Sequence, residues 1–243
     1  MFRRAFLVLV ALLLVAPSSQ ARDREDPAIA SPRNKEYGWM SIATWNGLHE
    51  KFLKRTKEGK VDLLFLGDSI TQGWGDNAVW KKYYTPRNAA NYGIGGDTTQ
   101  NVLWRINNGE IEGLSPKAIV LLIGTNNFGL EGDKPEDVAR GVTTIIKTLR
   151  EKLPQSKVIL LGILPRDQKP DTAFRQKIAS VNEAIAKLDD GQHVRYFYFG
   201  DKFLNADGTL PKDLMPDFLH LSEKGYAVWA EAMEPLLKQL LGE

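Results

Sequence analysis

Five short, strand-like runs recur along the chain with helical stretches between most of them, and this alternation limits the folds that the chain can adopt. The runs lie at residues 61–66, roughly 88–92, 118–123, 157–163 and 194–199. The helical stretches lie at about 39–57, 98–109, 134–154, 171–191 and 222–241. Continuous apolar strands joined by crossover helices are typical of a parallel sheet that is covered on both faces. The sequence therefore predicts an α/β fold built around a parallel sheet.

The N-terminus has the pattern of a cleaved export signal. Arg3 and Arg4 form a basic start, residues 5–16 are apolar, and Ser19 and Ala21 precede a small-x-small cleavage point. A membrane anchor is the alternative, but a span needs about 20 apolar residues and this run is shorter. We therefore predict a signal peptide at 1–21, a loosely ordered, flexible leader at 22–38 and one domain at 39–243.

Charge and cysteine content exclude several classes of protein. The chain has 32 Lys and Arg against 30 Asp and Glu; removing residues 1–21 takes away two arginines and no acids, so 30 remain of each sign. A neutral mature chain does not call for a nucleic-acid partner. With no cysteine there is no thiol nucleophile, no disulfide and no thiolate metal site. We expect neither a metal nor a cofactor.

Three polar, glycine-rich segments follow the first three predicted strands, at 67–69, 93–97 and 124–127. In a parallel α/β sheet, the site lies beyond the carboxyl ends of the strands. Each segment alone has an ordinary interpretation, since a serine caps helices and glycine or asparagine makes turns. Together they indicate an active site, in which Gly67 lets the backbone turn sharply and presents Ser69.

A serine nucleophile needs a base, and the chain has three histidines. His49 lies on a predicted helix, and His193 lies at the amino end of the fifth predicted strand, away from the expected site. His220 follows the fifth strand, with Asp217 three residues earlier. A bend over that spacing can bring the carboxylate to one imidazole nitrogen and leave the other for Ser69. The alternative for this pair is a capped helix start.

Four blocks of the chain match one enzyme family in order. They are "GDSIT" at 67–71, "GIGGDTT" at 93–99, "GTNN" at 124–127 and "DFLH" at 217–220. The chain resembles the SGNH (GDSL-type) serine hydrolases over most of its length. The run "NYGIGGDTTQNVLWRINNGE" and the later "LGILPR" are most similar to the branch of the platelet-activating-factor acetylhydrolase catalytic subunits.

The resemblance implies a three-layer, flavodoxin-like fold with a five-stranded parallel sheet between helices, in agreement with the sequence pattern. It implies that Ser69 is the nucleophile and that Asp217 and His220 complete a triad. It also implies an oxyanion hole made by the N–H groups of Ser69 and Gly96 and the Asn126 side chain. The export signal departs from the intracellular subunits of that branch, so we do not expect their regulatory partner here.

The expected function is a secreted or periplasmic esterase for acetyl or other short-chain esters, with O-acetylated glycans as one substrate class. A lysophospholipase or thioesterase with the same triad is an alternative. A non-catalytic glycan-binding module is another, but it requires a broken triad. Phe128, Phe218 and Leu219 either line a small acyl pocket or pack ordinarily. We expect a small-molecule or glycan ester as partner, no nucleic acid and no stable membrane anchor; the oligomeric state stays open.

Overall fold

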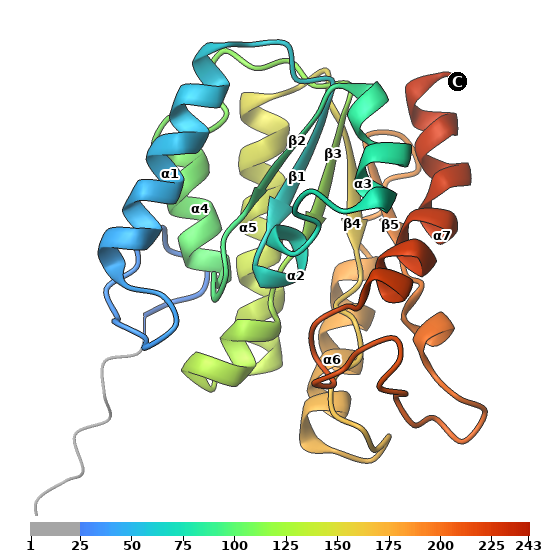
Figure 1. Ribbon diagram of the computed structural model, residues 1–243. Coiled ribbons are helices and arrows are strands. Elements are labelled where there is room, and N and C mark those ends of the chain that lie inside the picture. The colour runs from blue at the N-terminus through green and yellow to red at the C-terminus, as the bar shows by residue number, and fades with distance from the viewer. Residues whose placement is uncertain (1–24) are drawn as a thin grey trace, which may run out of the picture.

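A computed structural model describes residues 25–243, so the predicted signal peptide lies outside the described residues. Five strands form one parallel sheet in the order β2-β1-β3-β4-β5 (Figure 1). Their bounds are β1 Leu63–Gly67, β2 Ala89–Gly93, β3 Ala118–Leu122, β4 Lys157–Leu161 and β5 Val194–Phe197. Each strand begins within two residues of its predicted run. The three-layer, flavodoxin-like α/β fold predicted from the sequence is confirmed.

Seven α-helices accompany the strands in the part of the chain that the structure describes, together with short 3-10 helices at Thr85–Arg87 and Gly200–Phe203 and a short π-helix at Asn127–Glu131. Their bounds are α1 Ile42–Lys57, α2 Ser69–Gln72, α3 Ala78–Tyr83, α4 Thr99–Asn107, α5 Pro135–Lys152, α6 Ala173–Ala186 and α7 Glu223–Leu241. The five long ones match the predicted helical stretches. Helix α1 begins three residues later than predicted because the Ser41 side chain caps it by accepting from the Thr44 N–H. Helices α2 and α3 are too short to show a helical period in the sequence.

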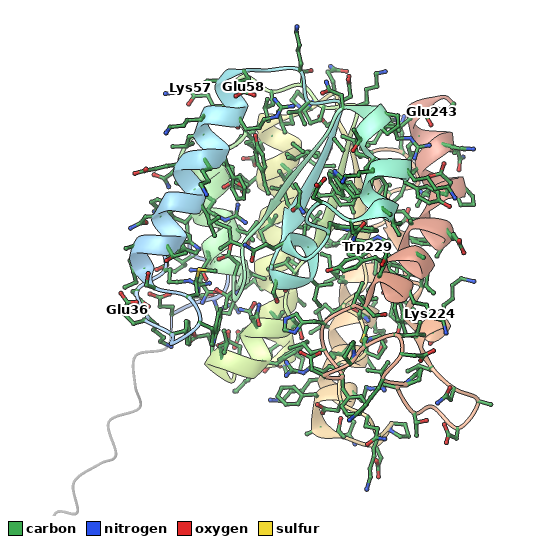
Figure 2. All side chains as sticks on the ribbon, viewed as in Figure 1. Glu36, Lys57, Glu58, Lys224, Trp229 and Glu243 are labelled. Atoms are coloured by element: carbon green, nitrogen blue, oxygen red, sulfur yellow. The ribbon has the colours of Figure 1, made fainter. Side chains whose placement is uncertain are left out.

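Alternate residues of each strand supply two separate hydrophobic layers. Leu64, Leu66 and Ile119 face one layer with α4, α5 and α6. Leu63 and Phe65 face the other, whose members include the fully buried Trp229 between α7 and the sheet (Figure 2). Because successive side chains of a strand point to opposite faces, a sheet covered on both sides needs apolar residues at nearly every position. This requirement explains the unbroken apolar runs.

Residues 25–38 form neither a helix nor a strand of the sheet, but they are attached to the domain. Arg33 is 5% exposed and donates a hydrogen bond to the Gly95 carbonyl at 2.8 Å. The Thr99 hydroxyl donates to the Pro27 carbonyl, and the Asn101 amide donates to the Ser31 carbonyl. The structure therefore differs here from the loosely ordered leader that the sequence predicts. The reason is that Arg33 donates a hydrogen bond to the buried carboxylate of Asp97, which lies 64 residues later in the sequence.

None of the helices within residues 25–243 combines the length and the apolar character needed to cross a membrane.

Candidate active site

Ser69 is the first residue of α2, directly beyond the carboxyl end of β1. Asp68 caps this helix, because its Oδ1 accepts a hydrogen bond from the Ile70 N–H at 2.9 Å. A Cβ on Gly67 would overlap Thr71 Oγ1 and the Leu122 carbonyl oxygen. The φ of Gly67 is not in the left-handed region, so the expected sharp turn is not what requires glycine there. Glycine is needed because β3 and α2 approach the backbone of residue 67 too closely for a side chain.

Three of the predicted side chains form a continuous hydrogen-bond relay. Ser69 Oγ lies 2.9 Å from His220 Nε2, and His220 Nδ1 lies 2.7 Å from Asp217 Oδ2. With the Nδ1 proton donated to the carboxylate, Nε2 is left to accept the serine proton. Residues separated by 151 positions in the sequence thus meet at the carboxyl edge of the sheet. The arrangement has the geometry of a serine nucleophile with an oriented base.

The loop that carries this carboxylate and base is a bend rather than the start of a helix. Asp217 Oδ1 accepts from the backbone N–H groups of Leu219 and His220, and Phe218 has a left-handed φ of 59°. Helix α7 is capped by Ser222 instead. The alternative interpretation as a capped helix start is therefore wrong. Partial burial raises the pKa of Asp217, but the hydrogen bonds and charge of His220, together with the Leu219 N–H, outweigh it and hold the pKa below its usual value. The carboxylate is consequently charged at neutral pH.

The predicted oxyanion donors lie together beside Ser69. A Cβ on Gly95 would lie 3.8 Å from the Cβ of Ser69, so the Gly95–Gly96 turn passes next to the nucleophile. Gly96 adopts a left-handed φ of 74°, which glycine accommodates without strain. Asn126 Nδ2 donates to the Asp97 carbonyl at 3.0 Å, which uses one of its two protons and fixes the amide against this turn.

The backbone N–H groups of Ser69 and Gly96 have no acceptor among residues 25–243. They are therefore available to bind an oxyanion, together with the second proton of the Asn126 amide. The role of each of these groups in the reaction stays a prediction.

Behind this turn lies a buried ionic cluster that the sequence did not reveal. Asp97 Oδ1 accepts from Trp45 Nε1 at 2.7 Å and from Arg33 Nη2 at 3.2 Å, and Oδ2 accepts from Arg105 Nε at 2.8 Å. Arg105 also pairs with Glu110. The cluster holds the turn that presents Gly96. Its members come from three separate stretches of the sequence, at residue 33, in α1 and at 97–110, so no local spacing could have identified the whole cluster.

Asp68 is a second buried carboxyl group at the site. Its Oδ2 atom has no hydrogen-bond partner in the described chain. Burial raises the pKa of Asp68 to about 7, and the charge of Asp97 adds to this effect, while the Ile70 N–H and Arg166 oppose it. A proton on Asp68 at neutral pH removes part of the cost of burying a charge beside the nucleophile.

The two other histidines lie away from the triad, and the three apolar candidates pack against the hydrophobic layers. His49 is buried beside Glu110, 3.3 Å away, and His193 precedes β5 at its amino end, where its N–H donates to Asp190. Phe128 is 4% exposed and belongs to the hydrophobic layer on the α5 side, so it packs ordinarily. Phe218 and Leu219 are partly buried against the layer on the α7 side. Within residues 25–243, no group of acidic or histidine side chains is arranged to hold a metal ion.

Comparison with known proteins gives consistent matches. Residues 65–228 match the model of the GDSL-like lipase/acylhydrolase family. "Platelet-activating factor acetylhydrolase IB subunit alpha2" of Gallus gallus is 40% identical over 200 residues, which cover 82% of this chain and 86% of the relative. The alpha1 subunit of Homo sapiens is 38% identical over 200 residues, covering 82% and 85%.

Two solved structures have the same fold. A GDSL-like lipase from Bacteroides thetaiotaomicron has a TM-score of 0.65 at 18% identity, covering 79% of this chain and 97% of that one. An acetyl xylan esterase has a TM-score of 0.60 at 21% identity, covering 72% and 98%. At these identities the two structures support the fold alone.

Proposed function

The chain belongs to the GDSL-like lipase/acylhydrolase family and is a carboxylic ester hydrolase, and on this premise we propose that it hydrolyses acetyl and other short-chain esters through an acyl-enzyme on Ser69. The observation that carries this proposal is the hydrogen-bond relay from Ser69 through His220 to Asp217. The acetyl preference is supported by relatives at about 40% identity whose names identify acetylhydrolases.

The first half of the reaction forms the acyl-enzyme. His220 Nε2 takes the proton of Ser69 as Oγ attacks the ester carbonyl carbon. Asp217 keeps the imidazole oriented and stabilises its charged form. The negative charge that develops on the carbonyl oxygen is received by the N–H groups of Ser69 and Gly96 and by the Asn126 amide. Each such donor is typically worth about 10²–10³ in rate. The protonated His220 then gives its proton to the leaving alcohol.

The second half regenerates the enzyme. Water attacks the acyl carbon with His220 as general base, and the same oxyanion donors stabilise the second tetrahedral intermediate. The C–O bond to Ser69 breaks, Oγ recovers its proton from His220, and acetate leaves. The chain's own side chains supply every proton transfer in this sequence.

Acyl-chain length distinguishes the proposal from a lysophospholipase or thioesterase with the same triad. The assay is a series of nitrophenyl esters from acetate to palmitate, with thioesters in parallel. We expect kcat/KM to be highest for acetate and to fall as the chain lengthens. A maximum at long acyl chains, or faster cleavage of thioesters, would favour the alternative. Absence of any hydrolysis would favour the non-catalytic glycan-binding module, which the complete set of triad residues argues against.

We also propose that the protein is exported, on the basis of the signal-peptide pattern at residues 1–21. Export makes O-acetylated glycans a substrate class within reach of the enzyme. Amino-terminal sequencing of protein from its native host should give a start near Arg22, and an intact Met1 would contradict cleavage. Acetate release from a panel of O-acetylated glycans tests the substrate class directly, with deacetylated samples of the same glycans as controls.

A further inference from the structure

Arg166 lies at the rim of the active site, in the loop that follows β4. The backbone of this loop is held firmly. Arg175 Nε donates to the Arg166 carbonyl at 2.6 Å, and Arg175 Nη2 donates to the Asp167 carbonyl at 3.1 Å. The Asp167 N–H donates to the carbonyl of Phe218, which lies in the bend between Asp217 and His220. The position of Arg166 is therefore fixed relative to the triad.

The guanidinium group of Arg166 points toward the other side of the site. Its Nη1 lies 3.4 Å from both the carbonyl and the hydroxyl oxygen of Thr125, the neighbour of Asn126. A Cβ on Gly129 would lie 2.9 Å from the same nitrogen. The ring centroid of Phe174 lies 4.3 Å from the centre of the charged group. Arg166 thus bridges the loop that carries the oxyanion amide and the loop that carries the general base.

The hydrogen-bonding capacity of this arginine is largely unused. Its Nε is buried and has no partner in the described chain, and the two bonds from Nη1 are at the long limit for a hydrogen bond. No carboxylate of residues 25–243 forms an ion pair with it. Asp167, Asp68 and Asp217 are near enough to act on its charge, but none of them forms an ion pair with it, and Asp217 binds His220 while Asp68 caps α2. Burial lowers the pKa of Arg166, but an arginine stays protonated at neutral pH.

A partly buried cation that forms no direct ion pair is costly for a folded protein. Support of the loop after β4 does not explain it, because Arg175 already holds that loop through two backbone carbonyls, and the bonds from Arg166 to the Thr125 loop are long. A ligand that brings an anion to the site would bind the Nη2 end of the guanidinium, which has no hydrogen-bond partner in the described chain and is not among the buried atoms. The planar guanidinium fork fits the paired oxygens of a phosphate or a carboxylate.

We propose that Arg166 is a specificity-determining residue that binds a phosphate or carboxylate on the alcohol part of the ester substrate. This inference rests on the proposed function, in which the acyl part is a short, uncharged group. Because an acetyl group carries no charge, the anion must belong to the alcohol. The substrates are then acetyl esters of acidic alcohols, such as phosphorylated polyols or uronic-acid glycans.

Two matched substrate pairs test the proposal with the unmodified enzyme. One pair is acetylglycerol phosphate and monoacetylglycerol, and the other is acetylated glucuronic acid and acetylated glucose. We expect kcat/KM to be about 10- to 100-fold higher for the anionic member of at least one pair, the range typical of a hydrogen bond to a charged group. Preference in the first pair identifies a phosphate and preference in the second a carboxylate. Equal rates within both pairs would overturn the proposal.

Substitutions of Arg166 test whether this residue causes the preference for the anionic ester. Arg166→Gln should abolish the preference for the anionic ester. Arg166→Lys should keep part of it, because lysine keeps the positive charge but lacks the planar guanidinium group. The control is Arg140→Gln, since Arg140 is an exposed arginine of α5 that binds Asp26 and Asp137. A preference that survives Arg166→Gln would also overturn the proposal. Should Arg166→Gln not fold in a melting test, the wild-type pairs and Arg166→Lys still decide the matter.

Hydrolysis of nitrophenyl acetate separates this inference from the function on which it rests. An enzyme that does not cleave nitrophenyl acetate would contradict the proposed function. An enzyme that cleaves it but shows no preference for anionic alcohols would contradict the role of Arg166 alone.

Discussion

Replacing Asp68 by asparagine should change how the stability of the protein depends on pH. Burial raises the pKa of Asp68 from 3.8 to about 7 in the folded chain. Between these values the folded protein binds a proton that the unfolded chain does not. The free energy of unfolding therefore falls as pH rises from about 4 to about 7, and this contribution is constant outside that window. A difference of about 3 pKa units corresponds to about 4 kcal/mol. The asparagine side chain would keep the oxygen that caps α2 but would not ionise.

Urea unfolding of wild type and Asp68→Asn at a series of pH values measures this effect. The stability of the variant relative to wild type should increase by about 4 kcal/mol between pH 4 and pH 7 and then stay level. Asp76→Asn, at an exposed aspartate, controls for the loss of a charge alone. A difference between Asp68→Asn and wild type that does not vary with pH would show that Asp68 does not take up a proton on folding. Activity is measured separately, because Asp68 is adjacent to the nucleophile.

Four further substitutions test the site. His220→Ala should lower kcat/KM by about 10²–10⁴ because the general base is lost, and His193→Ala should leave it near wild type; an equal loss in a folded His193→Ala would contradict the assignment. Asn126→Ala should lower kcat by about 3–4 kcal/mol in the barrier with little change in KM, and a loss confined to KM would remove this amide from the oxyanion hole. Arg33→Met should cost about 1.5–3 kcal/mol of stability and lower kcat, since Asp97 and the Gly95 carbonyl lose a donor. Unchanged melting and kinetics in that variant would show that the ionic cluster does not hold the turn.

The sheet could be predicted because the apolar pattern that marks each strand lies within the strand itself. A strand buried on both faces must be apolar at almost every position, so each of the five runs is visible without knowledge of its neighbours. Helices α2 and α3 could not be found in the same way, because four and six residues are too few to display a helical period. Their positions depend on the aromatic layer that includes Trp74, Trp80 and Tyr84, which forms only in the folded chain.

The residues of the site also fall into those that the sequence pattern identifies and those that only the tertiary fold brings together. Ser69, Asp217 and His220 could be named because strand ends, a three-residue spacing and the scarcity of histidine are all readable in the sequence. The contact between Arg33 and Asp97 spans 64 residues and requires the tertiary fold. The sequence suggests that Gly67 serves a sharp turn, whereas in the structure close packing is what requires glycine there. Turn conformation is a property of one residue, whereas the approach of the Leu122 carbonyl depends on the pairing of β1 with β3.

Formation of an acyl-enzyme on Ser69 can be detected by intact-mass measurement of rapidly quenched reactions. Wild-type enzyme mixed with excess nitrophenyl acetate should gain the mass of one acetyl group, and peptide mapping should locate that group on Ser69. Ser69→Ala, with an unchanged melting curve, should gain no acetyl group at this position and should lose at least about 10³-fold in kcat. Near wild-type hydrolysis by a folded Ser69→Ala, or an acetyl group carried by a different residue during turnover, would contradict the account.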